Sequence, residues 1–447
     1  MESGMMPEDV KYIIDTIKKA GYEAYAVGGC IRDMLLGKVP ADYDITTSAE
    51  PEVVKKLFRR TIDTGIKHGT VTVMLKDKGY EITTYRIDGK YEDGRHPLEV
   101  TFTKSLKEDL LRRDFTINAM AYNDEDGLQD PFNGQQDLKD GIIRCVGNPM
   151  ERFSEDALRM MRAVRFSAQL GYEIEEETLK AVKELAGTIS AVSMERIQVE
   201  MTKLLTSDNP ERLLLAYETG LTGYFLPEFD AMMKTPQNHP HHMYSVGLHT
   251  IKSMENVRPD KYLRFAMLLH DSGKPLVKTT GEDGIDHFHG HQSKSGELAV
   301  EVLRRLKFDN KTVDIVSKLA KLHDCSIGED ETSIRKAVNK IGEEIFPLLL
   351  EVKYGDIMAQ SNYLREEKLS KLEAVKAGYR EVLSKKDCVS LKSMKITGGD
   401  LIAIGYRPGP ELGSELNSLL ERVLNNPELN DNEILLNMAK EDLNEKN

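Results

Sequence analysis

The sequence predicts an α+β protein in which an N-terminal α/β domain is followed by all-α domains. At 447 residues the chain is too long for one hydrophobic core, and roughly 150 residues per domain suggests three or four units. Two β-rich runs, residues 69–75 and 80–85, are joined by a Lys-Asp-Lys-Gly hairpin signal. From Pro149 onward the apolar spacing is helical. We predict domains at residues 1–145, 146–235, 236–345 and 346–447.

Composition limits the class of protein. The net charge of −13 by itself favours a small-molecule enzyme over a nucleic-acid binder. Residues 365–395 nevertheless hold nine Lys or Arg against five Asp or Glu, which is either a solvated helix face or a surface that steers a phosphate backbone. The four cysteines are well separated and indicate reduced thiols. With no long apolar run and no signal-like N-terminus, we expect a soluble, cytoplasmic protein that contacts no membrane.

The first elements lead to a turn suited to phosphate. Residues 8–20 have the apolar spacing of an amphipathic helix, and residues 24–27 form an apolar strand. Gly28 and Gly29 then make a turn whose backbone N–H groups can approach a phosphate without a Cβ in the way. Arg32 follows one turn later and can clamp the same anion with its guanidinium fork. By itself, a Gly-Gly pair indicates only a turn.

Two aspartates follow on a predicted strand at residues 42–45. Because strand side chains alternate between faces, Asp42 and Asp44 should point the same way. Adjacent carboxylates repel unless a cation neutralises them, and Mg²⁺ binds one or two carboxylates together with substrate phosphates. Asp-x-Asp also occurs on solvated surfaces. The glycine turn followed closely by this pair favours a metal-dependent phosphate-chemistry site, with Asp42 and Asp44 as its catalytic Mg²⁺ ligands.

The rest of the α/β domain adds a third carboxylate and a loop. Glu81 begins a strand and is either a further carboxylate near the metals or a solvent-facing strand end. Residues 86–100 are rich in Gly and Asp and contain a Pro, which predicts a mobile loop and a candidate lid. In residues 112–120 (RRDFTINAM), Arg113 is the candidate anion contact. Asp114 and Asn118 are expected to hold a domain junction by capping and hydrogen bonds.

A helix with a charged stripe is predicted next, with Ser154 as its N-cap. Four charged residues recur every three positions, so that each neighbours the next: Asp156, Arg159, Arg162 and Arg165. The stripe is either an ordinary salt-bridged surface or a nucleotide contact. Cytosine and adenine both present an exocyclic amine beside a ring-nitrogen acceptor, whereas uracil and guanine present a carbonyl beside an N–H. One Asp and one Arg can pair with the first pattern.

Most of the eleven histidines lie between His239 and His291, starting in a predicted linker at residues 236–240. Packing does not readily explain such clustering. The candidate metal ligands are His249, His270, Asp271 and His291, with His289 as an alternative to His291 and the His323-Asp324 pair as a source of one more ligand.

The glycine turn and the aspartate pair of the N-terminal domain resemble those of a known family. Gly28-Gly29 with Asp42-x-Asp44 resembles the nucleotidyltransferase superfamily that includes DNA polymerase beta, most closely the bacterial class II tRNA nucleotidyltransferase (CCA-adding) and poly(A) polymerase family. Residues 112–120 and 155–159 (EDALR) continue the match in family order. The resemblance implies a polymerase-beta-like nucleotidyltransferase α/β head followed by all-α neck, HD and tail domains. It also implies Mg²⁺ as cofactor, CTP and ATP as substrates, and the tRNA 3′ end as partner.

By the same resemblance, the loop at residues 86–100 accompanies addition of the terminal A, and Asp156 with Arg159 reads the base without a nucleic-acid template. The residues implied to bind nucleotide are Gly28, Gly29, Arg32, Arg113, Asp156, Arg159, Arg162 and Arg165.

Two later segments resemble known modules. His249 with His270-Asp271 resembles the HD phosphohydrolases, which implies a second divalent transition metal that activates water. The alternative is a degenerate HD fold kept as scaffold. Residues 395–402 and 405–413 resemble the C-terminal tail of the tRNA nucleotidyltransferases, which implies contact with the tRNA elbow.

We therefore predict a template-independent tRNA nucleotidyltransferase that adds or repairs the 3′-terminal CCA by two-metal transfer, with HD phosphohydrolase activity in addition. The nearest alternative is a poly(A) polymerase, or an enzyme of the same fold that adds only A. No basic stretch such as Gly-Arg-Arg-Phe follows the two aspartates. Residues 66–70 (IKHGT) occupy that place, which favours CCA addition over the poly(A) polymerase alternative. A different alternative is an HD phosphohydrolase whose head only binds nucleotide. The sequence leaves the oligomeric state open.

Overall fold

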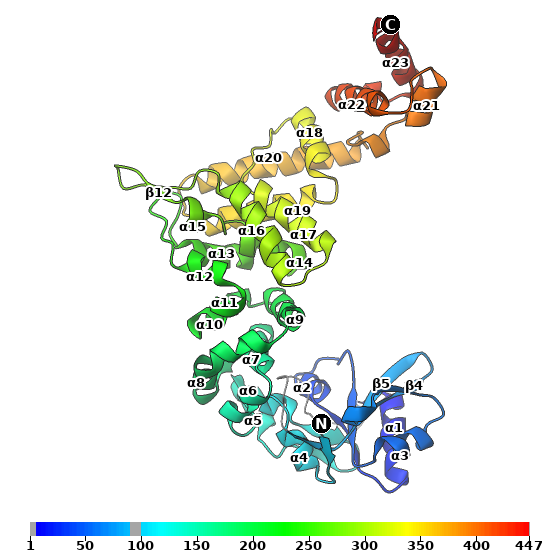
Figure 1. Ribbon diagram of the computed structural model, residues 1–447, viewed down its shortest axis with the longest axis vertical. Helices are drawn as coiled ribbons and strands as arrows, with labels where there is room; N and C mark the ends of the chain where they lie inside the picture. Colours follow the sequence, from blue (N-terminus) through cyan, green and yellow to red (C-terminus); the bar gives the residue numbers. More distant parts are fainter. Residues whose placement is uncertain (1–5, 90–99, 447) are drawn as a thin grey trace. The chain divides into compact units, whose positions relative to one another are not determined.

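The computed structural model describes residues 6–89 and 100–446, and these form two compact units. The first unit holds residues 1–230 with 305–307, and the second holds residues 231–304 with 308–447. The first contains a β-sheet followed by helices, and the second is almost entirely helical (Figure 1). This confirms the predicted α+β class. No helix in the described part of the chain is long and apolar enough to cross a membrane.

A seven-stranded sheet forms the N-terminal part of the first unit, in the order β3-β4-β5-β2-β1-β8-β9. Strand β1 runs antiparallel to β2 and β8, whereas β2 runs parallel to β5. Helices α1 and α3 pack against the sheet and against each other (Figure 1). The elements are α1 (Glu8–Lys19), β1 (Ala24–Val27), α2 (Gly29–Leu35), β2 (Asp44–Thr47), α3 (Pro51–Leu57), β3 (Thr61–Gly65), η1 (Ile66–His68), β4 (Thr70–Leu75), β5 (Lys78–Thr84), β8 (Ala121–Asn123) and β9 (Gly127–Gln129).

Two predictions about this sheet need correction. Strand β2 begins at Asp44, so Asp42 lies in the preceding loop rather than on the strand. The segment predicted as a loop from residue 86 begins and ends as an antiparallel pair, β6 (Arg86–Asp88) with β7 (Val100–Phe102). The isoleucine in β6 and the Val and Phe in β7 explain the pairing, because such residues favour extended backbone. The remainder of the predicted lid, residues 90–99, lies outside the described residues.

Helices connect the sheet to the neck. After α4 (Leu106–Leu111), η2 (Thr116–Asn118) and α5 (Gly134–Asp140), strand β10 (Ile142–Ile143) pairs with β11 (Glu173–Ile174). The remaining neck helices are α6 (Pro149–Glu155), α7 (Leu158–Leu170), α8 (Glu176–Leu185), η3 (Ala186–Ala191), α9 (Met194–Leu205), η4 (Pro210–Arg212), α10 (Leu213–Glu218), α11 (Thr222–Phe225) and α12 (Pro227–Met233).

The predicted helix start at Ser154 is wrong. Helix α6 begins at Pro149, where the Asn148 side chain accepts a hydrogen bond from Met150 N. Ser154 lies inside this helix, and its hydroxyl donates to Met150 O at 2.7 Å. An asparagine N-cap followed by proline at the first helical position is itself a helix-start signal, and it precedes the serine. The chain then breaks at Asp156 before α7 begins.

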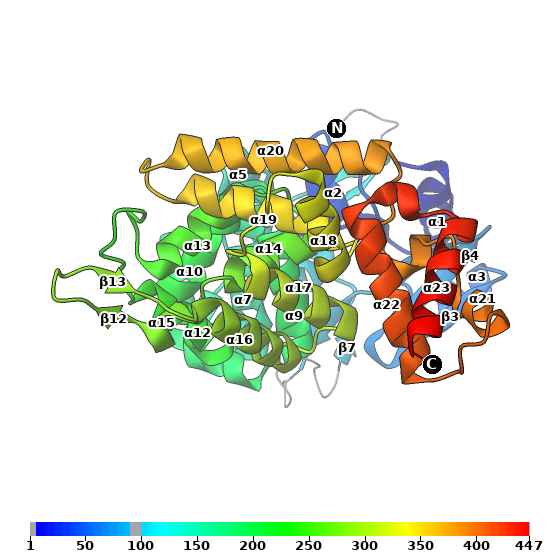
Figure 2. The same cartoon turned by 90° about the horizontal axis from the view of Figure 1, so that it is seen from above.

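The second unit packs helices around the histidine-rich segment. Helix α19 packs against α13 and α14, and α20 runs alongside α19 (Figure 2). The elements are α13 (Val246–Glu255), α14 (Lys261–Leu269), α15 (Lys274–Val277), β12 (Thr279–Thr280), β13 (Asp286–His287), α16 (His291–Arg305), α17 (Asn310–Leu322), α18 (Glu331–Ile341), α19 (Phe346–Ala359) and α20 (Arg365–Ser384).

The C-terminal segment has its own small core. The buried residues of this core include Leu401, Leu419, Val423 and Leu435. Its elements are η5 (Leu391–Ser393), α21 (Gly398–Ala403), α22 (Pro410–Asn425), η6 (Pro427–Leu429) and α23 (Asn432–Lys446). Thr397 caps α21 through a reciprocal capping box with Asp400, so a helix begins inside the segment that resembles the tail.

Candidate active site and metal centre

The register of the sheet places the glycine turn beside an aspartate. Asp44 at the start of β2 pairs with Val27 at the end of β1, and Gly28 follows Val27 directly. On the other side of β2, Ile45 pairs with Ile82 of β5, so Glu81 stands one position earlier, level with Asp44. The sheet thus brings the glycine turn and the carboxylates Asp44 and Glu81 close together, where β1 ends and β2 begins. Glu81 is solvent-exposed, which is compatible both with a further carboxylate near the metals and with a solvent-facing strand position.

The charge on Asp44 is held in an unfavourable setting. Burial by the surrounding protein raises its pKa, Arg113 opposes this, and the neighbouring Asp42 raises the pKa further. The Asp42 carboxylate thus acts on Asp44 although only Asp44 is on the strand. A cation would relieve this repulsion, so the oxygen donors fit a hard divalent ion such as Mg²⁺.

Arg113 lies against the turn. A Cβ built on Gly28 would stand 3.0 Å from Arg113 Nη1, and Gly28 has φ of 84°, so a side chain there would be both strained and crowded. Arg113 Nη2 is 3.9 Å from Asp109 Oδ2, and its buried Nε has no hydrogen-bond partner within the described residues. Burial lowers the pKa of this guanidinium. An anion entering the turn would find a donor already in place.

Arg32 joins three elements. Its Nη1 donates to Asn118 Oδ1 at 2.9 Å, its Nη2 pairs with Asp33 Oδ1 at 2.7 Å, and its guanidinium lies 5.1 Å from the Phe166 ring. The residue therefore connects α2 with η2 and with α7. Any phosphate contact by Arg32 would have to share these partners.

Asp114 and Asn118 hold the junction between sheet and neck. Asp114 accepts from Arg162 Nε at 2.8 Å, from Asn118 Nδ2 at 3.2 Å and from its neighbour's backbone N–H. Burial alone would raise the pKa of Asp114, but Arg162 outweighs it and holds the pKa far below the usual range. The carboxylate stays ionised at any working pH, and it fixes Arg162 toward the head.

Asp156 and Arg159, predicted to read the base, each contact further groups in this structure. Asp156 Oδ2 accepts from Arg196 of α9 at 2.7 Å, and its Oδ1 accepts from Leu158 N at 3.0 Å. Arg159 instead donates to Glu155 Oε2 and to Arg112 O, both at 2.8 Å. Helix α6 ends with its C-cap residue Asp156 and α7 begins at Leu158, so the charged stripe is not carried by one continuous helix as predicted. Arg196, which carried no motif signal, thus joins the site.

Arg165 lies deeper than the rest of the stripe. Its Nε donates to Glu200 Oε2 at 2.7 Å, both side chains are buried, and the guanidinium stacks 3.6 Å from the centre of Phe166. Arg32, Arg162 and Arg165 all surround this one ring. In this structure Arg165 supports the others rather than facing open space.

In the second unit, the predicted metal ligands converge. His249, His270 and Asp271 form one buried group with ligand atoms within 4.8 Å of one another, and Asp271, His291 and His323 form another. His289 belongs to neither group among the described residues, and its ring stacks on His287. Asp356 on α19 contacts His249 and was missed, since a single Asp beyond the predicted boundary at residue 345 carries no sequence signal. The fold alone brings it there.

The surrounding charges keep the cluster carboxylates ionised. Burial would raise the pKa of Asp271, but Lys274 and His270 outweigh it and hold the pKa well below the usual range. Burial lowers the pKa of His242, which lies beside His249, to about 3.

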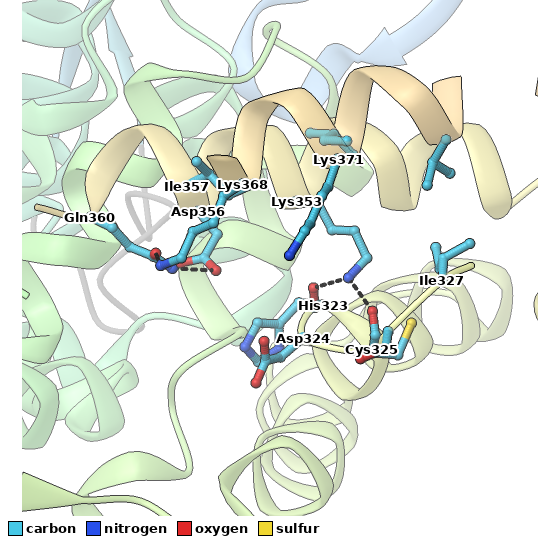
Figure 3. Close-up of a pocket in the computed structure, with 13 residues that line it drawn as sticks. His323, Asp324, Cys325, Ile327, Lys353, Asp356, Ile357, Gln360, Lys368 and Lys371 are labelled. Atoms are coloured by element: carbon cyan, nitrogen blue, oxygen red, sulfur yellow. Dashed lines mark hydrogen bonds between the residues drawn. The ribbon is translucent and has the colours of Figure 1, made fainter. Parts of the chain in front are cut away.

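Two adjoining pockets open on the cluster. One of about 460 Å³ is lined by Asp271, Lys274 and His291, and one of about 340 Å³ by Lys353 and Lys371. Both pockets are lined by His323, Asp324, Asp356, Gln360 and Lys368. Figure 3 shows His323 and Asp356 at the smaller pocket with the lysines around it.

Three family models match the chain. Residues 24–144 match the "Poly A polymerase head domain", residues 171–233 the "Probable RNA and SrmB- binding site of polymerase A", and residues 285–439 "tRNA nucleotidyltransferase domain 2". The first covers the sheet with its glycine turn and aspartates. The third covers α16 to α22 and the first half of α23.

Curated relatives align over nearly the whole chain. A CCA-adding enzyme of Ligilactobacillus salivarius is 35% identical, with 97% of this chain and 96% of the relative aligned. One from Pediococcus pentosaceus is 36% identical, with 96% of each aligned. Among solved structures, the Bacillus stearothermophilus CCA-adding enzyme in complex with CTP matches with a TM-score of 0.72 and 30% identity, covering 100% of this chain and 99% of that one.

Proposed function

The chain belongs to the CCA-adding enzymes, a family of tRNA nucleotidyltransferases, and on this premise we propose that it adds or repairs the 3′-terminal CCA of tRNA from CTP and ATP with Mg²⁺ as cofactor. The observation that carries the proposal is the geometry of the N-terminal sheet, in which the glycine turn, Asp44 and Arg113 lie together where β1 ends and β2 begins. It stands in a chain that aligns with CCA-adding enzymes over nearly its whole length.

In the head, the residues have separable tasks. When bound at Asp42 and Asp44, Mg²⁺ would supply charge neutralisation and lower the pKa of the attacking hydroxyl. The 3′ hydroxyl of the tRNA gives up its proton to solvent, its oxygen bonds to the α-phosphorus of the nucleotide, and the bond to the departing pyrophosphate breaks. Gly28 leaves the space in which phosphate oxygens meet the Arg113 guanidinium. Asp114 holds Arg162 in place at the neck.

The neck supplies the base contacts in this proposal. Asp156 retains lone pairs beyond those used by Arg196 and Leu158 N, since a carboxylate offers about four acceptor sites. Arg159, in the first turn of α7 just after the break, supplies guanidinium donors. Together they can satisfy the amine and ring nitrogen shared by cytosine and adenine. Arg32 and Arg165 act by positioning, through Asn118 and Glu200 respectively.

Nucleotide incorporation tests this function directly. Purified protein is given tRNA ending at the discriminator base with one labelled triphosphate at a time and then with CTP and ATP together. We expect two C residues and then one A, with no growth beyond that length. Incorporation of A alone, or a lengthening A tail, would replace the proposal with the A-adding or poly(A) polymerase alternative.

We propose a second activity for the histidine cluster, because four imidazoles and two carboxylates converge on one buried point beside lysine-lined pockets. A divalent transition metal held by His249, His270, Asp271 and His291 would supply Lewis-acid chemistry and water activation. Lys274 and Lys368 line the pocket and suit a phosphate group. In hydrolysis, the water oxygen bonds to phosphorus, the ester P–O bond breaks, and the departing oxygen takes a proton.

Turnover of phosphoesters tests the second activity. With Mn²⁺, Co²⁺ or Ni²⁺ we expect release of phosphate from phosphomonoesters or opening of 2′,3′-cyclic phosphates, and we expect His270→Gln to abolish it. His289→Gln is the comparison variant and should keep the metal, since His289 lines the same pocket but stacks on His287 outside the ligand groups. If no metal supports turnover, or if His270→Gln turns over like the parent, the cluster is scaffold.

A further inference from the structure

A buried carboxylate beside Arg113 is neither a proposed metal ligand nor a proposed nucleotide contact. Asp109 of α4 is fully buried. Its Oδ1 accepts from Arg112 Nε at 3.0 Å and from Arg86 N at 3.3 Å, and its Oδ2 accepts from the Thr46 hydroxyl at 2.9 Å. Arg113 Nη2 lies 3.9 Å from the same Oδ2. Each carboxylate oxygen therefore has two partners.

These partners use the acceptor capacity of Asp109. A carboxylate offers about four lone-pair sites, and Asp109 meets two guanidinium groups, one hydroxyl and one backbone N–H. No oxygen is left over to ligate a divalent ion. A buried charge is also costly unless its partners are well placed, so the carboxylate and the groups around it hold one another in position. Asp109 therefore acts on the site through the side chains that it contacts.

Thr46 connects Asp109 with the strand that carries Asp44. The two residues stand two positions apart on β2, so their side chains lie on the same face of the sheet. Thr46 is fully buried, and its hydroxyl makes a longer contact with Thr83 O at 3.3 Å besides the one to Asp109. Helix α4 is thereby attached to β2 on the side of the sheet where Asp44 stands.

Arg113 is held between Asp109 and the glycine turn. Its Nη2 is the atom near Asp109, and its Nη1 lies 3.0 Å from the place that a Cβ on Gly28 would take. Burial lowers the pKa of Arg113, and Asp109 is the strongest of the charges that oppose this. Because the guanidinium is planar and rigid, a partner at one terminal nitrogen also sets the position of the other. Asp109 thus fixes where Arg113 can meet a phosphate.

Arg112 extends the same contact to the neck. Its Nε donates to Asp109, and its backbone carbonyl accepts from Arg159 Nη2 at 2.8 Å. Arg159 is the residue proposed to supply donors to the base. Two consecutive hydrogen bonds therefore join Asp109 to Arg159, one at the side chain of Arg112 and one at its backbone.

We propose that Asp109 is a positioning residue that serves phosphate binding and base choice together, since it holds Arg113 at the glycine turn and, through Arg112, holds Arg159 at the base. The inference rests on the proposed nucleotidyltransferase function and deepens it, because one carboxylate couples two contacts to the same nucleotide. Loss of its charge is expected to weaken both contacts in one step and to leave Asp44 in place.

Steady-state kinetics of full-length Asp109→Asn test this role, because asparagine keeps the shape of the side chain and removes its charge. On tRNA ending at the discriminator base, we expect the KM for CTP to rise roughly tenfold or more, the loss that follows when a hydrogen bond to a charged group is weakened. The preference for CTP over UTP should fall by a similar factor. At saturating CTP, kcat should fall less than KM rises, because Asp44 is unchanged.

Asp126→Asn is the comparison variant. Asp126 is another carboxylate of the N-terminal sheet and accepts from Lys18, Tyr25 and Asn123, none of which belongs to the site. This variant should lower the melting temperature and leave both the KM for CTP and the choice between CTP and UTP at the parental values.

Thr46 supplies a milder variant that keeps the test decisive if Asp109→Asn folds poorly. Thr46→Val removes the hydroxyl at similar side-chain size, and we expect the KM for CTP to rise about threefold or more. Thr46→Ser keeps the hydroxyl and should restore the parental KM. Parental KM and base choice in both Asp109→Asn and Thr46→Val would overturn the inference and leave the proposed function standing. A parent that adds no nucleotide would overturn the function itself.

Double-mutant cycles separate positioning from a general loss of structure. If Asp109 acts through Arg113, Asp109→Asn should raise the KM for CTP no further in an Arg113→Ala background. If it also acts through Arg112 on Arg159, it should not change base choice further in an Arg159→Ala background. A carboxylate that only stabilises the fold would give effects that add to those of either arginine variant, and additivity in both cycles would overturn the positioning role.

Discussion

Replacing Asp44 by Asn is expected to reduce nucleotide addition by at least about 10³-fold, about 4 kcal/mol of transition-state stabilisation, while the chain folds normally. The substitution keeps the shape of the side chain and removes the charge that ligates the ion. The pKa of Asp44 is raised by desolvation and by Asp42 against the opposing charge of Arg113, and its side chain reaches solvent, so removing the charge should not destabilise the fold. The variant should therefore melt at the same temperature as the parent or higher, while its activity falls.

The measurement is single-turnover incorporation of CTP, with thermal melts in the presence and absence of Mg²⁺. Mg²⁺ should raise the melting temperature of the parent and do so less for Asp44→Asn, because only the parent binds the ion well. Asp77→Asn, in the exposed β4–β5 turn, is the matched control and should behave as the parent. Incorporation by Asp44→Asn at near the parental rate would contradict the assignment of this residue as a metal ligand.

The head was predictable because its signals are local. A glycine with positive φ, a short apolar strand and a carboxylate two positions after another are each read from adjacent residues. Their proximity follows from strand pairing, which period-2 patterning anticipates. Local patterning did not predict the start of β2 at Asp44. The spacing of Asp42 and Asp44 is the same whether one or both residues belong to the strand.

The neck was less predictable because its partners come from distant sequence. Arg196 reaches Asp156 from another helix, and Glu200 reaches Arg165 from the same one. Spacing along one helix predicts neighbours only while the helix continues, and Asn148 with Pro149 starts α6 early enough that it ends at Asp156. Long-range ion pairs of this kind depend on helix packing. A single sequence does not show which residues of two packed helices face each other.

The histidine cluster was more predictable from sequence than the neck and less predictable than the head. Its histidines are dense enough in sequence to be noticed, and His270-Asp271 is a local motif. Asp356 comes from a helix more than eighty residues away and is ordinary in composition, so it becomes visible only when α19 packs against α13.

Asp156→Ala is expected to weaken base choice more than it slows addition. A site that pairs both edge groups leaves a buried polar group unsatisfied when the wrong base enters, at about 1–3 kcal/mol per lost hydrogen bond, or roughly 5- to 150-fold in discrimination. Without the acceptor for the exocyclic amine, CTP and ATP should lose this advantage over UTP and GTP. The measurement is kcat/KM for all four triphosphates on tRNA ending at the discriminator base.

Arg196→Ala separates this role from a structural one. Asp156 and Arg196 form an ion pair at 2.7 Å, so a purely structural Asp156 should give the same phenotype when either partner is removed. In a double-mutant cycle, Arg196→Ala should then abolish any further effect of Asp156→Ala. If Asp156 reads the base, Arg196→Ala instead lowers all four kcat/KM values together and leaves discrimination intact, because the acceptor oxygen survives. A uniform fall in all four values for Asp156→Ala itself would make the residue a structural partner of Arg196 and leave base choice to other groups.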